Sequence, residues 1–202
     1  MIDRRTLLAG AALMPLCATP GLGQHQDLGV SDAETEMPRP RRWMMEDTFG
    51  TVVTNSDMLG KFILIYFGYT GCPDVCPTTL ATVAEAMDLL EDRAEAVVPL
   101  FVTVDPERDT PKLMREYVSF MHPSIVGLRG PKAYTDHMVK AFNARYEKHV
   151  PDPEHPDRYA IDHTSSVALV GPDGLLIKRY PYGTSAADMA QDLGAILDEA
   201  AG

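Results

Sequence analysis

The sequence predicts an α/β sandwich in which a central mixed β-sheet is flanked by helices. Two apolar runs, at 61–67 and 98–104, are continuous, as in strands that are buried on both faces of a sheet. Each run is followed by a segment whose apolar residues recur at helical spacing. The chain closes with a β-hairpin and a helix, which adds antiparallel strands to a sheet built by strand and helix alternation.

The N-terminal elements of the domain are a hairpin, a strand and a helix. Residues 43–46 and 51–53 are predicted to pair around the turn 47–50, and the apolar run at 61–67 is the first central strand. The next helix is expected to begin at Pro77, because proline is favoured at the first helical position. Its apolar face comprises Leu80, Val83, Ala84, Met87 and Leu90.

The rest of the domain continues this alternation. The strand at 98–104 leads to a helix at 111–121, for which Asp109 or Thr110 is the expected N-cap. The turn at 171–174, Gly-Pro-Asp-Gly, lies between two apolar runs and predicts a hairpin. The remaining predicted elements are a weaker strand at 125–128, a helix at 132–143, the hairpin strands at 166–170 and 175–180, and a helix at 186–200.

The chain divides into three parts. Residues 1–23 place Arg4 and Arg5 before a short apolar stretch and small residues, which is the order of a secretory signal and is similar to a twin-arginine signal. We expect export to the periplasm, with this segment either cleaved or kept as an anchor in the inner membrane. Residues 24–42 are polar and proline-bearing and predict a flexible arm, and residues 43–202 predict one domain.

The charge of the chain limits its partners. Its formal net charge is -11, and an acidic surface repels phosphate backbones. We therefore expect no nucleic-acid partner. The sequence also contains no hydrolytic triad and no phosphate-binding loop.

Cys72 and Cys76 are the only cysteines outside the signal segment. Each precedes a proline, so both are expected in extended or turn backbone, with Cys76 near the helix N-cap. The helix dipole there favours a thiolate, the form that binds metals and attacks disulfides. The residues alone leave three chemistries open: metal capture, thiol-disulfide exchange, or a structural disulfide.

Three motifs resemble the Sco/SenC family. They are the runs YFGYTGCPDVCPTTL at 66–80, VDPERDTP at 104–111 and DHTSS at 162–166, the last followed by GPDG at 171–174. The resemblance covers roughly residues 43–202. It implies a thioredoxin-like fold in an exported protein that is periplasmic or tethered to a membrane.

The same resemblance implies a function and its partners. One copper ion would be bound by Cys72, Cys76 and His163. Family members deliver copper to the dinuclear copper site of cytochrome c oxidase or maintain the thiols of that site. The expected partners are the copper-bearing subunit of the oxidase and other periplasmic copper chaperones or thiol reductants.

The residue types agree with copper as the metal. Two thiolates and one imidazole form a soft site that suits Cu(I) and accommodates Cu(II). A structural zinc ion would normally need a fourth protein ligand. Asp162 either orients His163 as a neighbouring carboxylate or is a solvated loop residue.

The hypothesis is a copper chaperone that is not an enzyme, with accessory thiol-disulfide chemistry at Cys72 and Cys76. The main alternative is a metal-free thiol-disulfide reductase that keeps the copper-site cysteines of the oxidase reduced. A peroxidase fits poorly, because of Pro73 and the close second cysteine. The charged, proline-bearing segment at 105–111 follows a strand, where such folds place their sites, but capping and turn chemistry explain it equally well. The loop at 151–158 is either a partner-facing insertion or a plain connection.

Overall fold

The computed structural model describes residues 40–155 and 157–202. The predicted signal at 1–23 and nearly all of the predicted arm at 24–42 lie outside the described residues. Within the described ranges, no helix combines the length and apolar character that crossing a bilayer requires.

Seven strands of the described residues form one mixed sheet. They are β1 Met44–Asp47, β2 Val52–Thr54, β3 Phe62–Gly68, β4 Val97–Thr103, β5 Val126–Arg129, β8 Val167–Val170 and β9 Leu176–Tyr180. Their order is β2-β1-β5-β4-β3-β8-β9. Strands β3, β4 and β5 are parallel, whereas β1 and β8 pair with them in the antiparallel sense. The predicted mixed sheet and N-terminal hairpin are confirmed.

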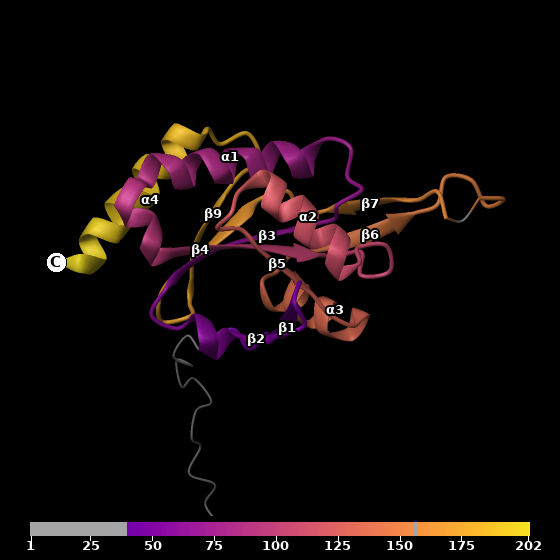
Figure 1. The fold of residues 1–202 in the computed structure, drawn as a ribbon, viewed down its shortest axis with the longest axis horizontal. Coiled ribbons are helices and arrows are strands. Elements are labelled where there is room, and N and C mark those ends of the chain that lie inside the picture. Colours follow the sequence, from indigo (N-terminus) through magenta and orange to yellow (C-terminus); the bar gives the residue numbers. More distant parts are fainter. Residues whose placement is uncertain (1–39, 156) are drawn as a thin grey trace, which may run out of the picture. The chain divides into compact units, whose positions relative to one another are not determined.

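Helices cover both faces of this sheet (Figure 1). The α-helices of the described residues are α1 Val75–Leu90, α2 Pro111–Met121, α3 Lys132–Ala141 and α4 Ala186–Ala201, and two 3-10 helices are η1 Asn55–Met58 and η2 Glu91–Ala96. Helices α1 and α4 pack against each other, and α2 contacts α1 and β5. The crossovers from β3 to β4 and from β4 to β5 advance in one direction, so right-handed connections place α1 and α2 on one face. Helix α3 packs near β1 on the other face.

The start of each helix reflects local chemistry. In α2, the Thr110 side chain accepts a hydrogen bond from the Leu113 amide and Pro111 occupies the first turn, so Thr110 rather than Asp109 is the N-cap. Helix α1 begins at Val75, two residues before the predicted Pro77. Cys76 therefore lies inside the first helical turn and not at the cap.

The core is centred on β3, of which every residue is buried. Successive side chains of a strand point to opposite faces. Tyr66 lies on the α1 face near the first turn of that helix, and its hydroxyl donates to the Val75 carbonyl at 3.4 Å. Phe67 points to the other face and packs on Phe142, just after α3, with ring centroids 6.3 Å apart. A strand buried on both faces explains the continuous apolar run in the sequence.

A second, two-stranded sheet was missed by the sequence analysis. Strands β6 Tyr146–His149 and β7 Ala160–His163 pair antiparallel, with Tyr146 opposite His163, and are not hydrogen-bonded to the large sheet. Figure 1 shows this hairpin extending from one end of the domain. The predicted loop at 151–158 lies within the connection between its strands.

Candidate metal centre

Cys72, Cys76 and His163 meet at one point of the structure. Their potential ligand atoms all lie within 4.8 Å of one another. In the described part of the chain, no other group of three or more His, Cys, Asp or Glu residues is arranged to hold a metal ion. Both cysteines are free thiols. The loop and first turn between β3 and α1 supply the sulfurs, whereas the end of β7 supplies the imidazole.

Cys76 is the most enclosed member of the group, with 0% of its surface exposed. Gly68, the last residue of β3, leaves room for its sulfur. A Cβ atom added at Gly68 would lie 2.8 Å from the Cys76 Sγ and 2.9 Å from the Phe101 ring. The sulfur of Cys76 can therefore occupy its observed position only because residue 68 has no side chain.

The expectation of a favoured thiolate at Cys76 is wrong for the metal-free protein. Burial raises the pKa of the Cys76 thiol far above its ordinary value, and a hydrogen bond from the Tyr69 backbone offsets this only in part. A thiolate in an apolar environment loses its hydration, and the helix start does not restore it. Without a metal, Cys76 is a neutral thiol.

Cys72 lies at the edge of the site, with 9% of its surface exposed. Its amide donates to the Tyr69 carbonyl at 3.2 Å, which closes a tight turn over Thr70 and Gly71. The turn folds the chain back after β3 and brings Cys72 toward Cys76.

His163 completes the group from the half-buried end of β7. Its Nε2 lies 3.1 Å from the Cys76 Sγ, and its Nδ1 lies 3.2 Å from the Thr164 carbonyl oxygen. A carbonyl can only accept, so the ring proton belongs on Nδ1 and the lone pair of Nε2 faces the sulfur. Burial also lowers the pKa of His163. The imidazole is therefore neutral, which is the form that binds a metal.

Two tyrosine rings fix the orientation of this imidazole. Tyr66 and Tyr69 each meet the His163 ring edge to face, with both centroid distances at 5.9 Å. The Tyr69 hydroxyl also accepts a hydrogen bond from the Ile161 amide at 3.4 Å. Tyr69 thus joins the cysteine loop to the strand that carries the histidine.

Of the two interpretations of Asp162, the structure favours a solvated residue over one that orients His163. Neighbouring residues of a strand point to opposite sides, and the Asp162 carboxylate pairs with the His149 Nε2 of strand β6 at 2.9 Å. Its side chain is 82% exposed. Its charge acts on His163 only as a lesser influence that raises the pKa.

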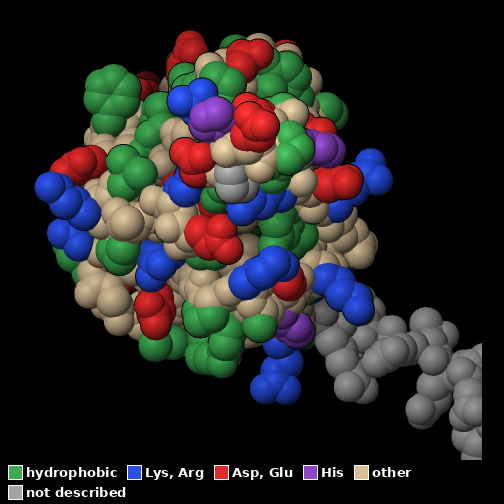
Figure 2. Space-filling view, turned by 90° about the vertical axis from the view of Figure 1, so that its right-hand side faces the viewer, with side chains coloured by type: hydrophobic (Ala, Val, Ile, Leu, Met, Phe, Trp, Pro, Cys, Tyr) green, Lys and Arg blue, Asp and Glu red, His purple; other side chains and the backbone are tan. Residues whose placement is uncertain are grey.

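An open hollow of about 650 Å³ lies beside His163. Its walls come from the end of β7, the segment before β8, the start of β6 and the two residues after β9, and they include Arg145, Glu147, Ser165 and Tyr182. Figure 2, which looks at the end of the domain with the β6–β7 hairpin, shows acidic and basic side chains intermingled. The residues that line the hollow also carry both signs of charge, with Arg145 beside Glu147 and Asp162.

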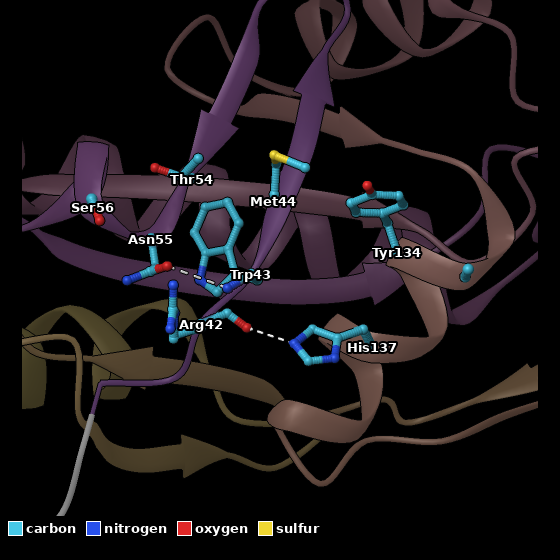
Figure 3. A pocket seen from close by; sticks show the side chains of 9 residues that line it. Arg42, Trp43, Met44, Thr54, Asn55, Ser56, Tyr134 and His137 are labelled. Carbon is cyan, nitrogen blue, oxygen red and sulfur yellow. Dashed lines mark hydrogen bonds between the residues drawn. The ribbon is translucent and has the colours of Figure 1, made fainter.

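A second hollow, of about 570 Å³, lies between the β1–β2 hairpin and α3 (Figure 3). It contains Trp43, Met44 and Tyr134, and the His137 Nε2 donates to the Arg42 carbonyl at 2.9 Å beside it. None of the predicted site residues lines it. Like the other described histidines outside the site, His137 has a polar partner that is not one of the three candidate ligands.

The segment 105–109 is more than the cap and turn that the sequence suggested. Asp105 and Asp109 are 3% and 1% exposed, and their carboxylates bond residues on both sides of the metal centre. A charged segment directly after a buried strand, at the end where such folds place their sites, is the signal that could have found them.

Comparison with known proteins identifies the family. Residues 33–198 match the SCO1/SenC family. The chain belongs to the SCO1/SenC family. The SenC protein of Rhodobacter capsulatus is 34% identical over 170 residues, which cover 84% of this chain and 75% of that protein.

Solved structures of this family have the same fold. ScoI of Bradyrhizobium japonicum with copper bound gives a TM-score of 0.70 at 33% identity, covering 78% of this chain and 98% of that one. ScoI of Arabidopsis thaliana with copper bound gives 0.72 at 28% identity, covering 79% and 98%. The predicted thioredoxin-like sandwich is confirmed.

Proposed function

We propose that this SCO1/SenC protein is a copper chaperone that donates its cargo to the dinuclear copper centre of cytochrome c oxidase. One copper ion would be held by Cys72, Cys76 and His163. The observation that carries the proposal is the convergence of two thiols and one neutral imidazole within 4.8 Å. Such a soft, three-donor site suits Cu(I) and accommodates Cu(II). The copper-bound ScoI relatives support the same metal.

The three ligands differ in how they take up and release the ion. Binding replaces the thiol protons, so the raised pKa of Cys76 makes affinity depend on pH. His163 offers a lone pair without losing a proton. His163 also lines the open hollow, whereas Cys76 is fully enclosed. We infer that an acceptor ligand replaces His163 first and the sulfurs afterwards.

The free thiols favour a second role for the same pair. Cys72 and Cys76 could reduce a partner disulfide: they would form a disulfide with each other while the partner gains two thiols, which transfers two electrons and two protons. In the chaperone, oxidation by a disulfide of this kind would remove both sulfur ligands and expel copper. The raised pKa of Cys76 slows this exchange, because the thiolate is the nucleophile.

We also propose that the chain acts in the periplasm, after export by its N-terminal signal. Its partners there would be the copper-bearing subunit of the oxidase and other copper chaperones or thiol reductants. Cell fractionation of the full chain with a C-terminal tag tests the location, and the size of the tagged product tells a cleaved signal from a retained anchor.

Copper titration of the reduced protein tests the chaperone proposal. Wild type should bind one ion, and Cys72→Ala and Cys76→Ala should each abolish binding. His163→Ala should weaken it by about tenfold or more, since loss of even a residue that only orients a ligand costs about 10- to 100-fold. The matched control is His137→Ala, an exposed histidine at the other hollow, which should bind like wild type.

A disulfide-exchange assay on the same variants separates chaperone from reductase. A metal-free reductase would tolerate His163→Ala in exchange with a disulfide substrate, and its function would not depend on bound copper. Full-affinity copper binding by either cysteine variant would contradict the ligand assignment.

A further inference from the structure

Segment 105–109, between β4 and α2, contains two buried carboxylates that the proposed function does not use. A carboxylate taken out of water must be hydrogen-bonded or paired. The partners of Asp105 and Asp109 therefore show what this segment holds in place. They belong to the two separate parts of the chain that supply the sulfurs and the imidazole.

Asp109 holds the cysteine loop. Its Oδ2 accepts from the Thr70 amide at 3.1 Å, and its Oδ1 accepts from the Thr70 hydroxyl at 2.5 Å. The Thr103 hydroxyl, at the end of β4, donates to Oδ2 at 2.5 Å. Thr70 precedes Cys72 by two residues, so this carboxylate ties the cysteine turn to the large sheet.

Asp105 and Arg108 hold the strand that carries the histidine. The Asp105 carboxylate pairs with the Arg108 Nε and accepts from the Tyr159 hydroxyl at 2.7 Å. The Arg108 Nη1 donates to the Tyr159 carbonyl at 3.0 Å, and the guanidinium carbon lies 3.6 Å from the centroid of the Tyr159 ring. Tyr159 directly precedes β7, so the start of this strand is fixed to the same segment.

Backbone hydrogen bonds between strands do not hold this hairpin against the large sheet, because β6 and β7 pair only with each other among the described strands. Two further side-chain contacts also link the hairpin to this part of the domain. The Lys148 Nζ of β6 lies 3.2 Å from the Glu107 carboxylate, and Tyr69 bonds Ile161 as described above. Side chains of segment 105–109 and of the cysteine loop thus attach the hairpin to the domain near the metal centre, while Tyr146 of β6 bonds Asp136 of α3 at 2.6 Å.

We propose that residues 105–109 form a clamp that sets the separation between the cysteine loop and His163, with Arg108 as its positioning residue. The clamp rests on the proposed function, since it acts on the same three ligands. Arg108 suits this task because its planar group bonds Asp105 and the Tyr159 carbonyl while it stacks on the Tyr159 ring. Its Nη2 is buried and has no hydrogen-bond partner among the described residues, and the guanidinium lies 5.5 Å from the centroid of the Tyr69 ring. Aromatic rings thus surround this end of the group.

The test combines copper titration with the sulfur-to-copper charge-transfer band of the Cu(II) form. Arg108→Ala should weaken copper binding by about 10- to 100-fold and shift the band, as expected for residues that orient ligands. Arg108→Lys keeps the charge but loses the planar fork, so it should not restore affinity. The matched control is Arg93→Ala, which breaks a surface Arg–Asp pair with Asp198 and should bind like wild type.

A double mutant separates positioning from general destabilisation. In a His163→Ala background, Arg108→Ala should have no further effect on affinity, because the ligand that it positions is gone. An equal loss in both backgrounds, or wild-type affinity and spectrum in Arg108→Ala, would overturn the clamp. If wild type bound no copper at all, the proposed function would fail instead.

Tyr159→Phe keeps the test decisive if Arg108→Ala does not fold. This change removes only the hydroxyl that bonds Asp105 and retains the stacked ring. It should reduce affinity in the same direction by a smaller factor, again with no effect when His163 is absent. Unchanged affinity and an unchanged band in a folded Tyr159→Phe protein would count against the clamp.

Discussion

Gly68 illustrates how a single residue shapes the metal centre. Any side chain at this position would clash with the Cys76 sulfur and the Phe101 ring. The added methyl group of Gly68→Ala should displace the sulfur, weaken copper binding, and lower the free energy of unfolding by about 1–3 kcal/mol. Copper titration and urea unfolding measure the two effects.

Gly71→Ala is the matched control for this substitution. Gly71 lies in the turn that follows β3, and its added Cβ would come no closer than 3.7 Å to the Tyr69 ring, an ordinary contact. It should retain affinity. If Gly68→Ala bound copper and resisted urea like wild type, the steric argument would be wrong.

Asp109 predicts a specific pH dependence at the residue scale. Burial raises its pKa above the ordinary 3.8, although Thr103 and Thr70 oppose the shift. Between the unfolded and the folded pKa, the folded state still holds a proton that the unfolded state has released, so rising pH reduces stability. Asp109→Asn cannot titrate. Its free energy of unfolding minus that of wild type should increase as pH rises from about 4, and urea titrations that give a flat difference would contradict this.

At the scale of elements, the β6–β7 hairpin should function without its tip. Residues Val150 and Tyr159 face each other next in the register that pairs His149 with Ala160. An Asn-Gly pair in place of residues 151–158 would therefore close the hairpin with a two-residue turn. The hydrogen bonds within the tip are local.

We expect this shortened variant to fold and to bind copper like wild type, with the free energy of unfolding changed by no more than about 0.5 kcal/mol. Tyr159 and the contacts of the clamp are retained in it. Loss of transfer to an acceptor with intact copper binding would identify the tip as a partner-facing insertion. Loss of copper binding would show that the tip supports the site.

The predictable elements are those whose cause is local. Continuous apolar sequence predicted β3 and β4, and Thr110 with Pro111 predicted the start of α2. Strands β6 and β7 were missed because most of their side chains are exposed and mostly polar, which gives no apolar period. Their position depends on distant contacts such as that of Tyr159 with Asp105.

The site was predictable to a similar extent. The cysteine pair stood out by composition, and His163 by its motif. The burial of Cys76 could not be read locally, because neighbouring strands supply Gly68 and Phe101 around its sulfur. The sequence left open whether Asp162 orients His163 or is solvated, because only strand alternation directs its carboxylate toward His149.

At the scale of the whole molecule, the core and the metal centre should respond separately to mutation. Leu193 of α4 has 0% of its surface exposed and belongs to the helix that packs on α1. Leu193→Ala should lower the free energy of unfolding by about 2–5 kcal/mol because it leaves a cavity. Copper affinity should stay at the wild-type value, because sites without shared partners are additive. Urea unfolding beside copper titration tests this, and a coupled loss of affinity would contradict it.

The unequal exposure of the three donors has a kinetic consequence. Of the three donors, His163 lines the open hollow and Cys76 is fully enclosed. We expect a competitor for the proposed copper ion to approach from the side of His163. Small chelators should therefore remove the metal faster than bulky chelators of equal affinity. The domain would then retain its copper against bulky competitors until a complementary acceptor docks.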